Sequence, residues 1–349
     1  MEPVPRQFFN LYKANMPATI RDVARKANVG VGTVSRVINN SPSVSEETRK
    51  KVLTAIEELH YRPNPIARQL STGRTLTVGV ILPHLTMPSY VERLRGVQRA
   101  LADTEYDLVL FCVESPSQRD TYFDDLSRTT RVDGILIISI PPNDEQAEKF
   151  AKSTIPTILV DAYHPSLCSI ITNDVEGGQK ATEHLIKLGH QKIAFLGDFL
   201  ETPFHPSMRF RFQGYREALS KAGIEYNANY HFEGENERAV AREMAKELLS
   251  TNDPPTAIFA GCDTQAIGVL DAANEMGIDI PQQLSVIGYD GIRDAEYLNL
   301  TTIDQHLFNS GVEGVNLLIH FLRQKSINSC RKFIPTELNI RGTTKPLQQ

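Results

Sequence analysis

The stretch that decides the fold of the N-terminal region is "TIRDVARKANVGVGTVSRVIN", residues 19–39. Apolar residues recur at helical spacing in residues 20–27 and again in residues 34–38. Between them, Asn28-Val29-Gly30 has the composition of a tight turn. Ala24 is small at the point where a second helix must cross the first. The spacing therefore predicts a helix-turn-helix unit.

A third helical pattern follows this unit. Ser45 is a good N-cap, and the two acidic residues after it lie in the first turn, where the helix dipole favours negative charge. Val52, Ile56 and Leu59 form its apolar stripe. Three such helices enclose one small core, so we expect residues 17–60 to form an all-α head.

Charge is unevenly distributed along the chain. Residues 17–76 contain ten Lys or Arg and five Asp or Glu, whereas the whole chain has a net charge of -5. A basic head on an acidic body favours a polyanionic partner for the head alone. A surplus of basic residues on a solvated face of a purely structural three-helix cap is the competing interpretation.

The second helix carries the residues best suited to DNA, because an α-helix fits the major groove, where each base pair shows a distinct pattern. Arg36 can pair bidentately with guanine, whereas Ser35 and Asn39 suit phosphate, which positions the helix without reading sequence. The predicted DNA-binding residues of the head are Arg21, Val31, Gly32, Thr33, Ser35, Arg36 and Asn39.

The segment "YRPNPIARQL", residues 61–70, begins a linker that we place at residues 61–76. Asn64 followed by proline reads as an N-cap and first helical position. A helix this short cannot hold itself together in water. The alternative is a plain linker without a helix, but such a linker would have no use for an N-cap followed by proline. Before the head, residues 1–16 lack periodicity, and we expect a disordered extension.

After residue 76 the sequence pattern changes, and short apolar runs alternate with amphipathic helical runs. The apolar runs include TVGVIL, GILII, KIAFLG and LSVIGYD. This rhythm predicts parallel sheets covered by helices on both faces. The pattern R-x-x-G-x-x-x-A-L follows a strand twice, at residues 93–101 and 211–219, which indicates two similar α/β subdomains. No apolar run is long enough to span a bilayer. The four scattered cysteines are typical of reduced thiols in a cytoplasmic protein.

The pieces "TVSRVIN", "YRPNPIARQL" and "TLTVGVILP" occur in succession, and together they resemble the lactose/galactose repressor (LacI/GalR) family. The similarity runs from about residue 19 to "NIRG" near the C-terminus, and is nearest to the catabolite-control and carbohydrate-responsive branch. The resemblance implies a periplasmic-binding-protein-like body of two Rossmann-like parallel-sheet subdomains over residues 77–345. The first would comprise residues 77–173 and 304–332, and the second residues 174–303 and 333–345.

The resemblance also implies that the linker is a hinge helix, which folds when two copies meet over the operator centre. Leu70 occupies the position of the residue that wedges into a base step from the minor groove, and Ala67 the small packing position before it. Such a wedge costs unstacking energy and gains contacts with bent DNA. Asn64, Ala67 and Leu70 therefore complete the predicted DNA-binding set. The implied partners are a second copy of the chain and a near-palindromic operator.

Three residues match effector-contacting positions of the family, namely Asp161, Arg211 and Asp290. Carboxylates with a guanidinium suit the hydroxyls of a sugar-like effector. Ser89 and Cys262 are the further predicted lining residues. The thiol of Cys262 is a poor hydrogen-bond partner, and the chain has no tryptophan to stack on a sugar. A vestigial pocket with control by a protein corepressor therefore stays open as an alternative.

Two other classes of protein explain less of the chain. An extracytoplasmic solute-binding protein needs an export signal and has no use for residues 19–70. An enzyme on a Rossmann-like body needs phosphate-binding or nucleophile motifs, but "GVGTVS" holds only a lone G-x-G and no P-loop occurs. We predict no catalytic residues, metal or cofactor. The expected function is that of a cytoplasmic, effector-controlled transcription repressor.

Overall fold

The computed structural model describes residues 18–62, 73–128, 131–201, 206–324 and 330–347. Within this range the chain divides after Thr75 into two compact units, a head and a body. The expectations for residues 1–16, and for Asn64, Ala67 and Leu70, fall outside the described residues.

The described part of the head contains three helices, α2 (Ile20–Lys26), α3 (Val31–Ile38) and α4 (Glu46–Glu58). The carboxylate of Asp22 accepts hydrogen bonds from the backbone N–H and the hydroxyl of Thr19, at 3.0 and 2.6 Å, and these bonds lower the pKa of Asp22. Ser45 caps α4 by accepting from the Thr48 N–H at 3.4 Å. Fully buried valines from all three helices, Val34 among them, form one small core, which confirms the predicted all-α head.

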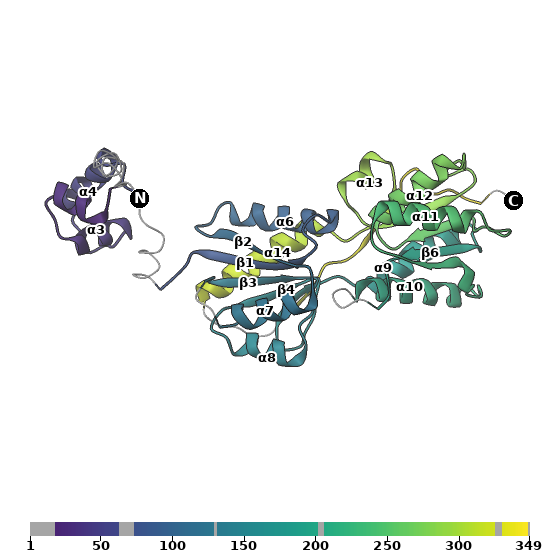
Figure 1. The fold of residues 1–349 in the computed structure, drawn as a ribbon, viewed down its shortest axis with the longest axis horizontal. Coiled ribbons are helices and arrows are strands. Elements are labelled where there is room, and N and C mark those ends of the chain that lie inside the picture. The colour runs from purple at the N-terminus through teal and green to yellow at the C-terminus, as the bar shows by residue number, and fades with distance from the viewer. Residues whose placement is uncertain (1–17, 63–72, 129–130, 202–205, 325–329, 348–349) are drawn as a thin grey trace, which may run out of the picture. The chain divides into compact units, whose positions relative to one another are not determined.

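The body contains two six-stranded sheets (Figure 1). The first has the strand order β11-β5-β4-β3-β1-β2, and the second has the order β12-β10-β9-β8-β6-β7. The two orders correspond strand by strand, so that β1 is equivalent to β6 and β4 to β9. Among the described strands, the β10–β12 pair is antiparallel and the other pairs are parallel. The strands of the first sheet are β1 (Thr77–Pro83), β2 (Asp107–Val113), β3 (Gly134–Ile138), β4 (Thr157–Val160), β5 (Cys168–Ile171) and β11 (Arg331–Phe333). Those of the second are β6 (Ile193–Gly197), β7 (His231–Glu233), β8 (Ala257–Ala260), β9 (Ser285–Asp290), β10 (Thr301–Asp304) and β12 (Glu337–Asn339).

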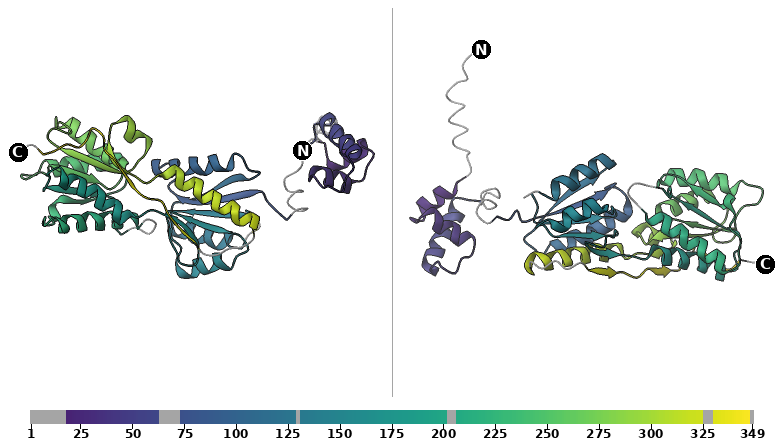
Figure 2. Two further views of the ribbon diagram at one scale, coloured as in Figure 1. Left: turned by 180° about the vertical axis from the view of Figure 1, so that it is seen from behind. Right: turned by 90° about the horizontal axis from the view of Figure 1, so that it is seen from below.

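Helices cover both faces of each sheet, and each covered face buries its own apolar cluster (Figures 1 and 2). This confirms the predicted α/β body. On the first sheet, α6 (Pro88–Leu101) and α14 (Leu307–Gln324) lie opposite α7 (Pro116–Leu126) and α8 (Asp144–Lys152). On the second, α9 (Asp174–Lys187) and α10 (Ser207–Lys221) lie opposite α11 (Arg238–Leu249) and α12 (Asp263–Glu275). Two shorter helices also lie in the described part of the body, η1 (Ala228–Tyr230) and α13 (Arg293–Tyr297). No helix in the described part of the chain is long and apolar enough to cross a membrane.

The chain passes between the two sheets three times, at residues 172–173, 305–306 and 334–336. After β10 it returns as α14, which packs on β3, β4 and β5 of the first sheet. Each sheet is therefore built from separate parts of the chain. Open parallel sheets place ligands at the carboxyl ends of their strands. These three connections leave or enter the sheets at those ends.

The glycine of the repeated R-x-x-G pattern brings two helices into close contact in each half. A Cβ on Gly96 of α6 would lie 2.0 Å from the carbonyl oxygen of Phe308 in α14. In the second half, a Cβ on Gly214 of α10 would lie 2.1 Å from the carbonyl oxygen of Val175 in α9. Only glycine permits this approach. The arginine one turn earlier in each pattern is thereby held at the end of its sheet.

Candidate functional site

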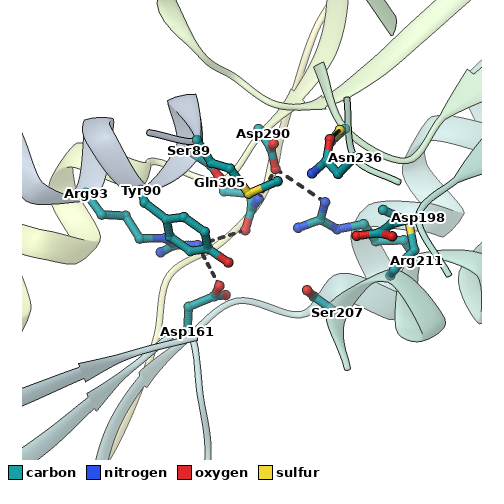
Figure 3. A pocket seen from close by; sticks show the side chains of 13 residues that line it. Ser89, Tyr90, Arg93, Asp161, Asp198, Ser207, Arg211, Asn236, Asp290 and Gln305 are labelled. Atoms are coloured by element: carbon teal, nitrogen blue, oxygen red, sulfur yellow. Dashed lines mark hydrogen bonds and ion pairs between the residues drawn. The ribbon is translucent and has the colours of Figure 1, made fainter. Parts of the chain in front are cut away.

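A cavity of about 50 Å³ lies between the two sheets of the body, at the carboxyl ends of their strands (Figure 3). Its lining comes from both sheets and from the connection at Gln305, and most of it is polar. The residues around it are Met87, Ser89, Tyr90, Arg93, Asp161, Asp198, Ser207, Met208, Arg211, Asn236, Cys262, Asp290 and Gln305.

The wall formed by the first sheet is centred on a buried ion pair. Arg93, in α6, is 2% exposed, and its Nη2 lies 3.0 Å from Oδ2 of Asp161, which follows β4. The Arg93 Nη1 donates to the hydroxyl oxygen of Ser310 at 2.7 Å. The same carboxylate oxygen of Asp161 accepts from the Ser139 hydroxyl at 2.6 Å. The guanidinium and the carboxylate are thus both fixed at the cavity.

The wall formed by the second sheet repeats this arrangement. Arg211, in α10, has its Nη1 at 3.3 Å from Oδ1 of Asp290, the last residue of β9. The Arg211 Nε donates to Oδ1 of Asp174 at 2.9 Å, and its Nη1 donates to the carbonyl oxygen of Gly261 at 2.8 Å. The guanidinium also lies over the ring of Tyr289, 3.9 Å from its centroid, which adds a cation–π contact.

The two walls are equivalent in topology. Arg93 is on the helix after β1 and Arg211 on the helix after β6, whereas Asp161 follows β4 and Asp290 ends β9. Both aspartates have positive φ, 57° and 121°. Our sequence-based set contained Asp161, Arg211 and Asp290 but not Arg93. The signal was present, because the repeated R-x-x-G pattern begins at Arg93 and again at Arg211.

Gln305 links the two walls. Its Oε1 accepts from Arg93 Nη2 at 3.3 Å, and its Nε2 donates to Asp290 Oδ1 at 2.5 Å. An unbroken chain of polar contacts therefore runs from Arg93 through Gln305 and Asp290 to Arg211. Sequence inspection gave no signal for Gln305, because its place depends on where the chain crosses between the sheets.

In the head, the residues predicted to contact DNA lie mostly on α3. Val31, Gly32 and Arg36 are exposed, and Val31 is 42% exposed although it is apolar. Thr33 and Ser35 are half-buried. Two further members of the set are exposed, Arg21 at the start of α2 and Asn39 just after α3. One helix therefore presents a mixed surface of guanidinium, hydroxyl and apolar groups to its surroundings.

Two sequence families match successive parts of this chain. The bacterial regulatory proteins of the lacI family match residues 19–64, and the periplasmic binding protein-like domain matches residues 182–344. Catabolite control protein A of Priestia megaterium is 33% identical over 95% of the chain and 100% of that protein. The ribose operon repressor of Escherichia coli K12 is 35% identical over 93% of the chain and 99% of that protein. The chain belongs to the LacI family.

Solved structures agree with this assignment. The lac repressor dimer bound to operator and the anti-inducer ONPF matches with a TM-score of 0.83 and 29% identity, over 95% of this chain and 100% of that one. A ribose-bound LacI family regulator of Enterococcus faecium matches with a TM-score of 0.69 and 28% identity, over 78% of this chain and 100% of that one. This LacI-family protein is a DNA-binding transcription regulator, as the sequence predicted.

Two predicted lining residues of this LacI-family regulator have local structural roles as well. Ser89 lies in the first turn of α6 and is half-buried. Cys262 is the N-cap of α12, where its sulfur accepts from the Gln265 N–H at 3.4 Å. The Cys262 thiol donates to Oδ1 of Asn236 at 2.9 Å. The thiol therefore has partners in the cavity wall. No group among the described residues has the His, Cys, Asp and Glu ligands to hold a metal ion.

The carboxyl of Asp290 gives the body of this LacI-family protein a testable pH dependence. Burial raises the pKa of Asp290 from 3.8 to about 6, although Arg211 and Arg93 oppose the rise. Between about pH 4 and 6 the native state then binds more protons than the unfolded state, so the stability from this group falls as the pH rises. We expect the stability of the wild type relative to Asp290→Asn to fall by roughly 1–3 kcal/mol over this window. Urea titrations at several pH values measure it, and a constant difference would contradict it.

Proposed function

We propose that this LacI-family regulator is a repressor whose operator affinity is set by a sugar or sugar derivative bound between the two sheets of the body. The observation that carries the proposal is the pair of matched Arg–Asp contacts, Arg93–Asp161 and Arg211–Asp290, on opposite walls of one cavity. Each contact offers a hydroxyl both a donor and an acceptor, at a fixed place. A ring with hydroxyls on both edges can engage both walls.

The effector would act through the connections between the sheets. A sugar that accepts a hydrogen bond from Arg93 and donates one to Asp290 competes with Gln305, which now binds both. Loss of that link would let the two halves of the body reorient. In a homodimer, this changes the spacing of the two hinge segments, residues 61–76, and so the ability of Asn64, Ala67 and Leu70 to order on a near-palindromic operator. Linkage requires that operator binding change sugar affinity by the same factor.

The effect of sugars on selected DNA tests this function. Duplexes from a random pool are selected with the full-length protein, and the selection is repeated with D-ribose, cellobiose and other sugars. A near-palindromic site whose retention changes with one sugar supports the proposal. If no sequence is enriched, the proposal that the protein represses from a specific operator is contradicted. We place this action in the cytoplasm and assign no enzymatic activity.

One observation favours a second candidate, a vestigial pocket with control by a protein corepressor. The cavity is only about 50 Å³, and the two arginines in its walls already pair with Asp161 and Asp290. The two candidates differ in a thermal-shift experiment with the same sugars. A sugar that raises the unfolding midpoint of the wild type but not of Arg93→Met supports the sugar-controlled repressor. If no sugar moves the midpoint while a palindromic site is still selected, the corepressor candidate is favoured.

Replacing Arg36 by Ala tests base recognition by α3. If Arg36 pairs with guanine, the variant loses discrimination at one base pair in each half-site, by about 1–3 kcal/mol, and binds the alternative bases almost equally. Competition binding against single-base variants of the selected site measures this loss. Arg25→Ala, on α2, is the control, because Arg25 is an exposed arginine of the head outside the predicted DNA-binding set. An equal loss of affinity for every sequence would make Arg36 a phosphate contact.

A further inference from the structure

Two cysteines meet at the edge of the first sheet. Cys168 opens β5, and Cys330 directly precedes β11, the parallel strand beside it. The register pairs Arg331 with Ser169, so that the two cysteines before them stand opposite each other. The Cys330 thiol donates to the Cys168 sulfur at 2.8 Å, and the Cys330 N–H donates to the same sulfur at 3.1 Å. A disulfide joins sulfurs at about 2.05 Å, so a shift of under about 1 Å would suffice.

We propose that Cys168 and Cys330 are a modification site, at which a peroxide oxidant forms a reversible intramolecular disulfide. The two cysteines differ in their exposure to solvent, which suits a pair in which one thiol reacts first with the oxidant. Cys330 is half-buried, so we assign the first reaction with the oxidant to it, whereas Cys168 is 1% exposed and supplies the second sulfur. The other cysteines, Cys112 and Cys262, have no thiol contact of this kind among the described residues.

The chemistry balances with hydrogen peroxide as the oxidant. The Cys330 thiolate attacks one peroxide oxygen, the O–O bond breaks, and the departing hydroxide takes up a proton to give water. The Cys330 sulfenic acid is then attacked by the Cys168 sulfur, the S–O bond breaks, and the Cys168 proton leaves with the hydroxide as a second water. Two thiols are oxidised and one peroxide is reduced. Burial raises the pKa of the Cys168 thiol, which makes this thiol a poor first nucleophile.

The bond would join the amino-terminal ends of two strands that each lead into a connection between the sheets. β5 leads to the connection at residues 172–173, and β11 leads to that at residues 334–336. The closed loop, residues 168–330, would contain the connections at residues 172–173 and 305–306, and the connection at residues 334–336 would follow just outside it. A cross-link between distant parts of a chain stabilises by restricting the unfolded state. The oxidised body should therefore unfold at a higher temperature, with β11 held firmly against β5. This modification does not depend on the identity of the effector.

The test uses the full-length protein with and without hydrogen peroxide. We expect free thiols under denaturing conditions to fall from four to two, with a mass loss of two hydrogen atoms that a dithiol reductant reverses. The unfolding midpoint of the body should rise by several degrees, and amide exchange should slow in peptides containing β5 and β11. Cys112→Ser is the matched control and keeps the response.

The variants Cys330→Ser and Cys168→Ser should each lose the response, and two separate positions guard against a folding defect in one of them. The disulfide is excluded if peroxide converts the wild type to sulfinic acid without the mass loss. It is also excluded if the thiol count falls equally in the wild type and in Cys330→Ser. The same holds if the bridged peptides link other cysteines.

Discussion

Replacing Arg211 by Met is expected to lower the unfolding free energy of the body by about 3–5 kcal/mol at pH 7, the usual cost of leaving buried charges without a partner. Arg211 is 6% exposed and pairs with two carboxylates, Asp174 at 2.9 Å and Asp290 at 3.3 Å. Methionine fills the space but supplies no charge or hydrogen bond. Burial already raises the pKa of both aspartates against the opposing effect of Arg211. Without the guanidinium their pKa values rise further.

The pH dependence of this loss identifies its cause. A carboxyl with a raised native pKa favours the folded state when protonated, and this stability is lost as the pH rises through the native pKa. The loss in Arg211→Met should therefore be smaller at pH 5 than at pH 7, by calorimetry or urea titration. Adding Asp174→Asn to Arg211→Met should recover part of the stability at pH 7. A loss independent of pH would mean that packing, not charge, decides it.

Arg93→Met is the matched control on the opposite wall. Its carboxylate partner, Asp161, is 11% exposed and accepts a hydrogen bond from the Ser139 hydroxyl at 2.6 Å. That carboxylate therefore keeps a donor and some water when Arg93 is removed. We expect a smaller loss of stability than in Arg211→Met, although both variants should lose the thermal response to a bound sugar. Equal losses of stability would contradict the difference in burial between the two walls.

Asp290 shows how much of the candidate site can be predicted from the sequence alone. In the sequence, this residue could equally serve as the cap of the helical segment after it. In the structure that helix, α13, has no side-chain cap, and Oδ2 of Asp263 accepts from the N–H groups of Gly291 and Ile292 just before it, at 2.8 and 3.0 Å. Asp290 is therefore available to Arg211 and Gln305. Asp263, nearly thirty positions before these N–H groups in the sequence, is the acceptor that binds them. No pattern of neighbouring residues predicts this contact.

The parts of the fold that were predictable are those with a local cause. Helical spacing in residues 20–38 and the cap at Ser45 are properties of neighbouring residues, and they predicted the head. Alternating apolar runs predicted the two parallel-sheet halves. Arg93 was within reach through the repeated R-x-x-G pattern, because equivalent strands and helices place equivalent side chains at the cavity. Gln305 was not, because its role arises from a crossing between the sheets.

Replacing Val34 by Asp should abolish specific operator binding while leaving the body intact. Val34 is fully buried at the centre of the head, among residues of α2, α3 and α4. A unit of this size has only about 2–7 kcal/mol of stability at the usual value per residue. A buried carboxylate without a partner costs more than about 4 kcal/mol. The head should therefore unfold, and affinity for the selected site should fall about 10³-fold or more, to the level of non-specific binding.

The charge-matched control is Val31→Asp, in the same helix. Val31 is 42% exposed, so its replacement adds the same negative charge without opening the core. It should weaken DNA binding by repulsion and loss of an apolar contact, yet keep the helical signal of the head in circular dichroism. Because the chain divides into two compact units after Thr75, the unfolding transition of the body should be unchanged in both variants. A shifted body transition in Val34→Asp alone would show that the head contributes to the stability of the body. Specific binding that survives Val34→Asp would remove α3 from DNA recognition.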